Sequence, residues 1–438
     1  MLTRQKTFAL PPGLWIVGAV LGLAAGAAVV VPTGYLIAGV ATVATAAAFF
    51  RATVRSELIV AAYWIALCVF STMLTGAVIG GMFYPFYVAL ILGVVLGLLS
   101  GGLQVHPFVG WTYVAFLVVL VLSLVGYQES LGSATLERLI VYPFGALVLL
   151  QFRSVRGVRT VALAAVAAAL AVSAWVIVSA VQGGFAYRGS IEVNENVVSF
   201  YVALGLVVAL AERLHLSDDR RLIGSTLLTI LAMGTMTYAL VLLASRGMII
   251  GLALAVVALG VRVAIVDRRR LGFLALVLVV ASTGLLLPGG QGILERFENP
   301  STATGGGRIQ IWGTIGRGLA TGSAGEMLLG HGFEASRDLV SRTFSSLDST
   351  HNAYLQIVYD LGSLGLVLFI ALHGFVFARS WRTPGRDGAA MLGLVTFLLG
   401  SSLFMSTPDN FLYWTALGLA LALATWSVPH DSGVRAAS

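Results

Sequence analysis

Apolar runs long enough to cross a lipid bilayer recur from one end of this chain to the other. Of its 438 residues, 58% are hydrophobic and only 10% are charged, which is about half the charge density of a soluble domain. A run of about 20 apolar residues crosses the hydrocarbon core of a bilayer as a helix. We therefore expect an all-α, polytopic membrane helix bundle that forms a single transmembrane domain over residues 1–438.

The hydropathy pattern predicts fourteen membrane spans, or twelve if a pair of the shorter ones does not cross. The expected spans are 14–31, 34–50, 58–78, 83–100, 108–126, 138–151, 160–181, 196–211, 222–243, 248–266, 271–287, 353–378, 389–405 and 411–427. Three of them, at 34–50, 138–151 and 196–211, are short enough to be tilted, re-entrant or interfacial. The first run also resembles a signal peptide, but the next span follows at once, so we expect an uncleaved first span.

Arginines accumulate in every second connection between these spans. With the N-terminus inside, the even-numbered turns carry Arg51, Arg55, Arg153, Arg156, Arg159, Arg213, Arg220, Arg221, Arg268, Arg269, Arg270, Arg379, Arg382 and Arg386. The opposite connections at 127–137, 182–195 and 406–410 contain Arg188 as their only basic residue. Because basic residues favour the cytoplasmic side, we expect both termini in the cytoplasm. This topology also accounts for the net charge of +7, so we expect no nucleic-acid partner.

One long polar connection, at 288–350, interrupts the spans, and the topology puts it on the extracytoplasmic side. It is embedded in the transmembrane domain, and it is where we expect water-accessible chemistry. Ile311, Ile315 and Leu319 have the spacing of one helical face, and a disordered loop would lack this apolar content. We expect short helices that lie along the membrane surface and cap a cavity.

Two arginines stand where a phosphate group would be bound. Arg246, within Ser245-Arg246-Gly247, lies at the outer junction of two spans, although the other outer flanks avoid arginine. Arg308 follows the glycines 305–307, which allow close backbone approach, and a guanidinium holds phosphate oxygens through two parallel hydrogen bonds. The alternatives are a topological flank residue and a solvated arginine after a flexible linker. The glycine run is not a Walker loop, because the Gly-Lys-Ser/Thr ending is absent.

His351-Asn352 lies where the chain re-enters the membrane after the long connection. Histidine has an unperturbed pKa of about 6.5, so it can act as a base near neutral pH, although a histidine at such a boundary is usually structural. His331 is a weaker candidate for the same role. Neither histidine has HExxH or paired-carboxylate spacing around it, and the lone Cys68 rules out a cysteine cluster, so we expect no metal site.

A set of short motifs in one order resembles the O-antigen ligase and polymerase superfamily. The motifs are Ser245-Arg246-Gly247, Arg308 with Trp312 four positions later, Leu329-Gly330-His331-Gly332, and His351-Asn352 followed by Gly362 and Gly365. Their order and spacing match over residues 240–370, whereas the earlier helices resemble the family only in hydrophobicity. Asp360 stands where a glutamate is the more usual residue, so the role of this acid is open.

The resemblance implies a GT-C type membrane glycosyltransferase that is inverting and independent of metals and other cofactors. Such an enzyme moves a glycan from a polyprenyl diphosphate, of the undecaprenyl type, to a hydroxyl of a sugar or glycolipid acceptor. The reaction takes place at the outer face of the bacterial inner membrane. By resemblance, Arg246 and Arg308 bind the diphosphate, His351 is the catalytic base, and Asn352 orients the histidine or the acceptor.

Other functions remain open at this point. The spacing from His351 to Gly362 and Gly365 is slightly closer to the ligase pattern than to that of an exopolysaccharide polymerase acting on lipid-linked repeat units. A solute transporter is the alternative from another class. Transporters usually carry ionisable groups near mid-membrane, and the clear candidates within the expected spans are Asp360 and His373.

Overall fold

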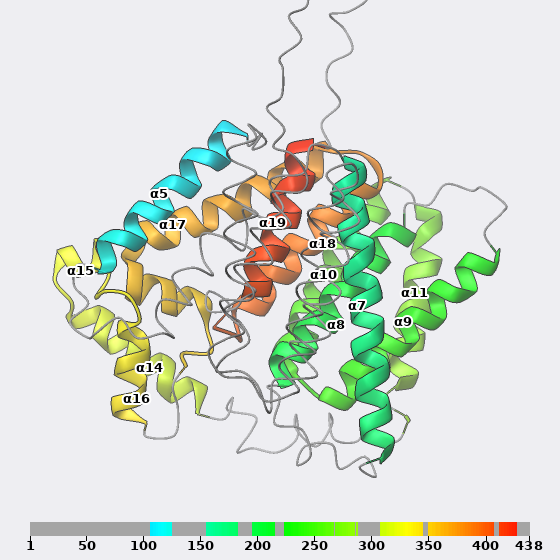
Figure 1. The fold of residues 1–438 in the computed structure, drawn as a ribbon, viewed down its shortest axis with the longest axis horizontal. Helices are drawn as coiled ribbons and strands as arrows, with labels where there is room; N and C mark the ends of the chain where they lie inside the picture. Colours follow the sequence, from blue (N-terminus) through cyan, green and yellow to red (C-terminus); the bar gives the residue numbers. More distant parts are fainter. Residues whose placement is uncertain are drawn as a thin grey trace, which may run out of the picture.

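The chain forms a bundle of long helices with a smaller group of short helices at one side (Figure 1). The computed structural model describes residues 106–124, 155–182, 195–214, 223–266, 268–284, 286–287, 307–344, 349–406 and 411–426. The expected spans at 14–31, 34–50, 58–78, 83–100 and 138–151 lie outside these residues, as does 288–306 of the long connection. Within the described ranges the regular structure is entirely helical, which confirms the expected all-α class.

The helices follow the apolar runs closely. They are α5 (Pro107–Leu124), α7 (Val155–Gln182), α8 (Glu195–Arg213), α9 (Ile223–Leu243), α10 (Arg246–Val266), the 3-10 turn η3 (Arg268–Arg270), α11 (Leu271–Gly284), α14 (Arg308–Thr321), α15 (Ala324–Leu329), α16 (Ala335–Thr343), α17 (Ala353–Arg382), α18 (Gly385–Ser402) and α19 (Phe411–Trp426). Nine of these correspond to expected spans. Helices α5, α8, α10 and α17 and the part Val161–Gln182 of α7 are long and apolar enough to cross a membrane, so the protein is a polytopic helical membrane protein.

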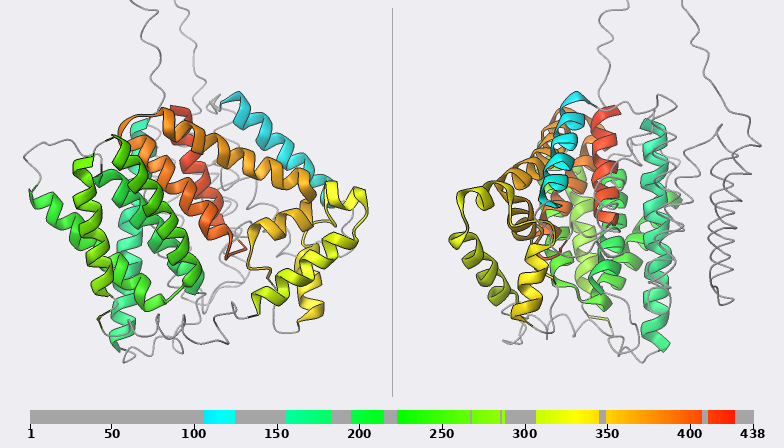
Figure 2. Two further views of the ribbon diagram at one scale, coloured as in Figure 1. Left: turned by 180° about the vertical axis from the view of Figure 1, so that it is seen from behind. Right: turned by 60° about the vertical axis from the view of Figure 1, so that its left-hand side comes forward.

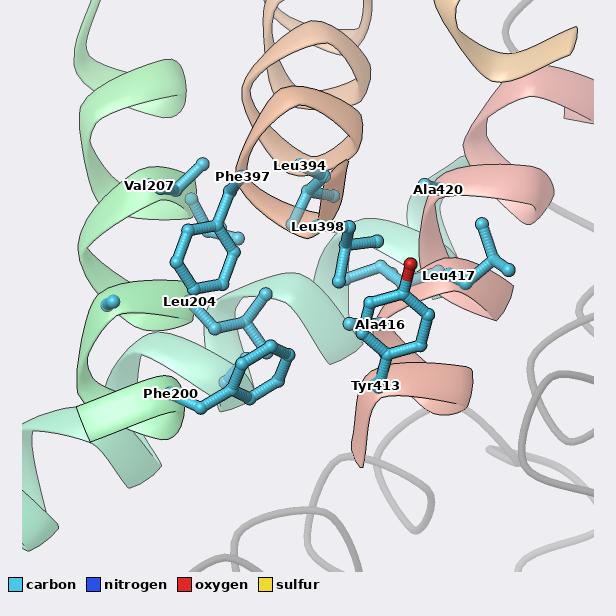
Figure 3. Close-up of a cluster of buried hydrophobic side chains, with 14 of the residues drawn as sticks. Phe200, Leu204, Val207, Leu394, Phe397, Leu398, Tyr413, Ala416, Leu417 and Ala420 are labelled. Atoms are coloured by element: carbon cyan, nitrogen blue, oxygen red, sulfur yellow. The ribbon is translucent and has the colours of Figure 1, made fainter. Parts of the chain in front are cut away.

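Helix α8 lies in the middle of the bundle, where it contacts α7, α9, α10 and α18. Its residues 198–211 are all buried, because neighbouring helices cover every side of it. The expected span 196–211 is therefore a 19-residue central helix and not an interfacial segment. Figure 3 shows part of this core, where aromatic and aliphatic side chains of α8 meet those of α18 and α19. The rings of Phe200 and Phe397 lie 5.2 Å apart at this contact.

Small residues allow α10 and α18 to pack closely. A Cβ atom added at Gly251 would lie 3.0 Å from the backbone nitrogen of Ser401, and one added at Gly400 would lie 2.9 Å from the Cα of Gly251. Close helix packing through glycine is common in membrane proteins. The hydrophobic effect contributes little to helix association within lipid, so van der Waals contact between the helices becomes important. The start of α10 and the end of α18 are thereby held side by side.

Contacts between helix ends agree with the alternating helix directions expected from the sequence. At one end of the bundle, Arg262 donates to the carbonyl oxygens of Ser380 and Thr383, both at 2.5 Å, and Arg386 pairs with Glu212 at 3.5 Å. At the other end, which we call the loop end, helices α8, α10, α17 and α18 meet near Asn196, Ser245, His351 and Ser406. The side of the membrane that each end faces stays a prediction from the distribution of arginine.

Within residues 307–344 of the long connection, the chain forms the helices α14, α15 and α16, which Figure 2 shows from two further directions. Ile311 and Ile315 of α14 are fully buried against Val340 of α16 and Tyr359 of α17, and Leu319 packs beside them. The predicted helical face of α14 is thus confirmed. This second, smaller core fixes the connection against the first turns of α17.

Helix α17 is broken at Gly362, where the backbone has φ 70° and ψ −175°. Near the break, the carbonyl oxygens of Tyr359 and Asp360 accept hydrogen bonds from the backbone nitrogens of His331 (2.8 Å) and Gly332 (3.2 Å). Gly330, with φ 85°, crosses Gly362 so closely that a Cβ atom on either glycine would overlap the other segment's backbone. The Leu-Gly-His-Gly motif is therefore a backbone crossing between the connection and α17.

We predict that Gly330→Ala destabilises the fold of the connection. Alanine disfavours positive φ by about 1 to 2 kcal/mol, and its Cβ would also overlap Asp360. Gly313→Ala is the matched control, because Gly313 lies within α14 with no atom within 4 Å of an added Cβ. Thermal unfolding in detergent should show a lower midpoint for Gly330→Ala and an unchanged or higher one for Gly313→Ala. Equal midpoints for Gly330→Ala and the unsubstituted protein would contradict the crossing.

Candidate active site

Arg246 is the first residue of α10, at the loop end of the bundle. The preceding turn is sharp, since Ala244 has φ 48°, and it is fixed by Ser245. The Ser245 side chain is buried, and its hydroxyl donates to Oδ1 of Asn196 on α8 at 2.8 Å. Ser245 therefore has a structural role in anchoring the turn from which Arg246 projects.

Arg308 begins α14, after Gly307 in a left-handed conformation with φ 84°. Burial of its guanidinium and then the positive charge of Arg246 lower the pKa of Arg308. The charge of Arg246 therefore acts on Arg308, although the two residues lie in different segments of the chain. An anion that contacts both guanidinium groups would relieve this repulsion.

His351 has a left-handed backbone conformation, with φ 50°. Its backbone nitrogen donates to the hydroxyl of Ser406 at 3.1 Å and to that of Ser349 at 3.3 Å. The next residue, Asn352, is the N-cap of α17, because its Oδ1 accepts from the backbone nitrogen of Leu355 at 3.0 Å. The side-chain oxygen of Asn352 therefore caps α17, and His351 lies in the turn directly before this helix.

The end of α18 connects these elements through what we call the Ser406 junction, formed by Phe404, Ser406, Trp312 and Thr350. The Ser406 hydroxyl lies 2.6 Å from that of Ser349 and 3.2 Å from that of Thr350. The indole nitrogen of Trp312 on α14 donates to the carbonyl oxygen of Thr350 at 3.0 Å. The turn that carries His351 is thus tied both to α18 and to the helix that begins with Arg308.

Phe404 extends the Ser406 junction to the start of α10. Its ring centroid lies 6.5 Å from that of Trp312, and a Cβ atom added at Gly247 would lie 2.6 Å from the Cβ of Phe404. The glycine of the Ser-Arg-Gly motif is therefore required by packing. Together, these contacts bring the segments that carry Arg246, Arg308 and His351 to one place at the loop end.

His331 contacts a different part of the connection. Its ring stacks on Tyr359 with centroids 4.2 Å apart, and its Nδ1 lies 3.4 Å from a carboxylate oxygen of Glu326. These contacts join α15 to α17 beside the backbone crossing. The contacts of His331 are therefore structural, and they do not involve the residues of the Ser406 junction.

Asp360 also has a structural contact. Its Oδ1 accepts a hydrogen bond from the backbone nitrogen of Ser336 at 2.7 Å, near the beginning of α16. The N-cap of that helix, Glu334, makes no capping hydrogen bond with its side chain. The buried carboxylate of Asp360 therefore caps α16 from another helix, which is the role that the sequence left open.

Sequence reasoning did not identify Ser406, Phe404 or Thr350. Ser406 is the first residue of a short polar stretch of sequence, Ser406-Thr407-Pro408-Asp409-Asn410, whose composition is ordinary for a connection between spans. Its importance comes from a contact with a residue 55 positions earlier. Among the described residues, no group of three or more His, Cys, Asp or Glu is arranged to hold a metal ion.

Comparison with known proteins identifies the segment that carries these residues. Residues 231–370 match the O-antigen ligase family, and this range contains Arg246, Arg308, Trp312 and His351. This match lies in the same part of the chain as the motifs that resemble the family, and it supports that resemblance. Over 105 residues, the chain is 30% identical to an O-antigen ligase of Pseudomonas aeruginosa. The alignment covers 22% of this chain and 26% of that protein.

We predict that Asp360→Ala lowers the stability of the protein, whereas Asp360→Asn is tolerated better. Loss of a capping acceptor typically costs about 1 to 2 kcal/mol, and asparagine retains an oxygen that can accept from Ser336. Thermal unfolding midpoints of the two variants in detergent measure the difference. If both variants lose the same stability, the charge of Asp360, and not its acceptor oxygen, is what the structure needs.

Proposed function

We propose that this protein is a membrane glycosyltransferase of the O-antigen ligase type. It would transfer a glycan from a polyprenyl diphosphate to a hydroxyl of a sugar or glycolipid acceptor, at the outer face of the bacterial inner membrane. The observation that carries this proposal is that the contacts around the Ser406 junction gather the segments of Arg246, Arg308 and His351 at the loop end, within the part of the chain that matches the family. The Pseudomonas aeruginosa relative is itself named an O-antigen ligase.

The two arginines suit the departure of a diphosphate. A sugar diphosphate has a good leaving group, so the reaction requires positive charge where negative charge develops more than it requires a general acid. Each charge-assisted hydrogen bond from a guanidinium contributes about 1.5 to 3 kcal/mol. Because Arg246 and Arg308 come from different elements, a diphosphate bound to both would also hold α14 against the bundle.

His351 is the proposed general base. It would accept the proton of the acceptor hydroxyl while the oxygen attacks the anomeric carbon from the side opposite the diphosphate, which inverts the configuration. The backbone of the His351 turn is held by Ser406 and, through Thr350, by Trp312. A fixed turn supports this role, because a base must lie within about 3 Å of the proton that it removes.

The ionisable residues expected of a transporter are engaged in structural contacts. Asp360 caps α16. His373 is fully buried, and its ring nitrogens lie 2.8 Å from the carbonyl oxygen of Phe369 and 2.7 Å from the hydroxyl of Tyr413. These contacts favour a packing role for both residues, which supports glycosyl transfer over solute transport.

We predict that Arg308→Ala and His351→Ala each reduce glycan transfer by the purified protein. Loss of one group that stabilises developing charge typically costs about 100- to 1,000-fold in rate. Arg317→Ala is the matched control, because Arg317 is exposed on the same helix and its guanidinium contacts Thr314. The assay uses a labelled polyprenyl-diphosphate glycan with the acceptor in detergent or vesicles. Transfer at the unsubstituted rate by Arg308→Ala would exclude the proposed site.

The same assay separates a ligase from a polymerase. A ligase forms product on a glycolipid acceptor that carries no polyprenyl chain, whereas a polymerase extends a second polyprenyl-linked repeat unit. Each acceptor is supplied alone with the same labelled donor. Product on the glycolipid alone excludes the polymerase.

We predict that Ser406→Ala lowers kcat with little change in the KM for the donor. The substitution removes a hydrogen bond to the His351 backbone, worth about 1 kcal/mol, whereas the arginines remain in place. We expect a fall in kcat of about five- to tenfold and partial recovery in Ser406→Thr, which keeps a hydroxyl. Ser401→Ala is the control, since Ser401 is buried on α18 and its hydroxyl bonds only locally, to Leu398 at 3.0 Å. An equal fall in kcat for Ser406→Ala and Ser401→Ala would show that the role of Ser406 is only structural.

A further inference from the structure

Helix α15 ends in three consecutive apolar residues that the protein leaves uncovered. Met327, Leu328 and Leu329 are 56%, 53% and 43% exposed, although they belong to a polar connection between membrane helices. The start of the helix is polar. Ser323 and Glu326 form a reciprocal capping box, and Glu326 also faces His331. The short helix therefore has a polar start and an exposed apolar end.

The backbone around α15 is fixed beside two long apolar helices. Its end lies on the break of α17, where a Cβ atom added at Gly362 would overlap the carbonyl group of Leu328. Shortly after α15, the backbone nitrogen of Phe333 donates to the carbonyl oxygen of Ser123, near the end of α5, at 3.2 Å. Figures 1 and 2 show α15 at the edge of the molecule, beside the end of α5 and the bend in α17.

The neighbouring parts of α5 and α17 present apolar side chains outward. Val121 and Leu122 are exposed near the end of α5, and Leu364 and Val367 are exposed just beyond the break in α17. Both helices are long and apolar enough to cross a membrane, so in a bilayer such outward side chains would face lipid. The apolar end of α15 thus continues a lipid-facing surface and does not form an isolated patch in water.

We propose that α15 is an interfacial anchor whose residues Met327, Leu328 and Leu329 insert among the lipid chains at the loop end of the bilayer. The polar start of the helix, with Ser323 and Glu326, would lie at the level of the lipid headgroups. Because the crossing at Gly330 and Gly362 ties α15 to α17, the anchor sets the depth of this part of the connection. The proposal concerns lipid contact alone and does not depend on the glycosyl-transfer reaction.

Site-directed spin labelling of the full-length protein in phosphatidylethanolamine and phosphatidylglycerol vesicles tests this anchor. Cys68, the only cysteine, is first replaced by serine, and Leu328→Cys is then labelled with a nitroxide. Met327→Cys provides a second position on the same apolar end. Ser341→Cys is the control, because Ser341 is exposed on the polar helix α16. Collisions with oxygen, which concentrates in lipid, are compared with collisions with a water-soluble nickel chelate.

We expect the labels at 327 and 328 to collide several times more often with oxygen than with the nickel chelate, and the label at 341 to show the reverse. Two results would overturn the proposal. Labels at 327 and 328 that respond like the label at 341 face water. Labels there that are inaccessible to both reagents are covered by protein, either another part of this chain or a second copy.

Discussion

The close packing of α10 against α18 is the contact on which the arrangement of the loop end depends. Gly251 and Gly400 let the two backbones approach so closely that there is no room for a side chain between them. As a result, the first turn of α10 and the residues that follow α18 are neighbours. Arg246 comes from the former and Ser406 from the latter. The turn that carries His351 and helix α14, which begins at Arg308, are attached to these two neighbouring segments. A change in the spacing between α10 and α18 would therefore move the candidate residues relative to one another.

The remaining contacts show how the described part of the polar connection forms backbone hydrogen bonds with the apolar bundle. A broken helix in a membrane protein exposes carbonyl groups that lipid cannot solvate. Here the break in α17 is compensated by backbone nitrogens from the connection. In return, the carboxylate of Asp360 supplies the cap that α16 lacks. The connection and α17 therefore supply hydrogen-bond partners to each other. This exchange explains the presence of Gly330, Gly362 and Asp360 in this part of the sequence.

The sequence predicts the helices and the segment of the candidate site more readily than the contacts within the site. Apolar runs are long and periodic, so α10 was expected at 248–266 and begins at Arg246. The face of α14 with Ile311 and Ile315 was likewise readable from its spacing. Ser406 was not, because a hydroxyl in a short turn gives no signal of the partner it meets in three dimensions. The capping contact of Asp360 could not be read either, because the sequence does not show which helix lies beside its carboxylate.

The backbone crossing at Gly330 and Gly362 has a consequence for how a bulky lipid-linked glycan would enter. Moving α15 away from α17 would break two backbone hydrogen bonds at the edge of the bilayer. Moving α14 would disturb the apolar contacts around Ile315 and the hydrogen bond from Trp312 to Thr350, and side-chain contacts of this kind re-form easily. The connection is thus divided into a part whose position is set by backbone bonds and a part attached through side chains. Arg308 belongs to the second part, so the proposed diphosphate-binding charge would stand on the segment that is attached through side chains.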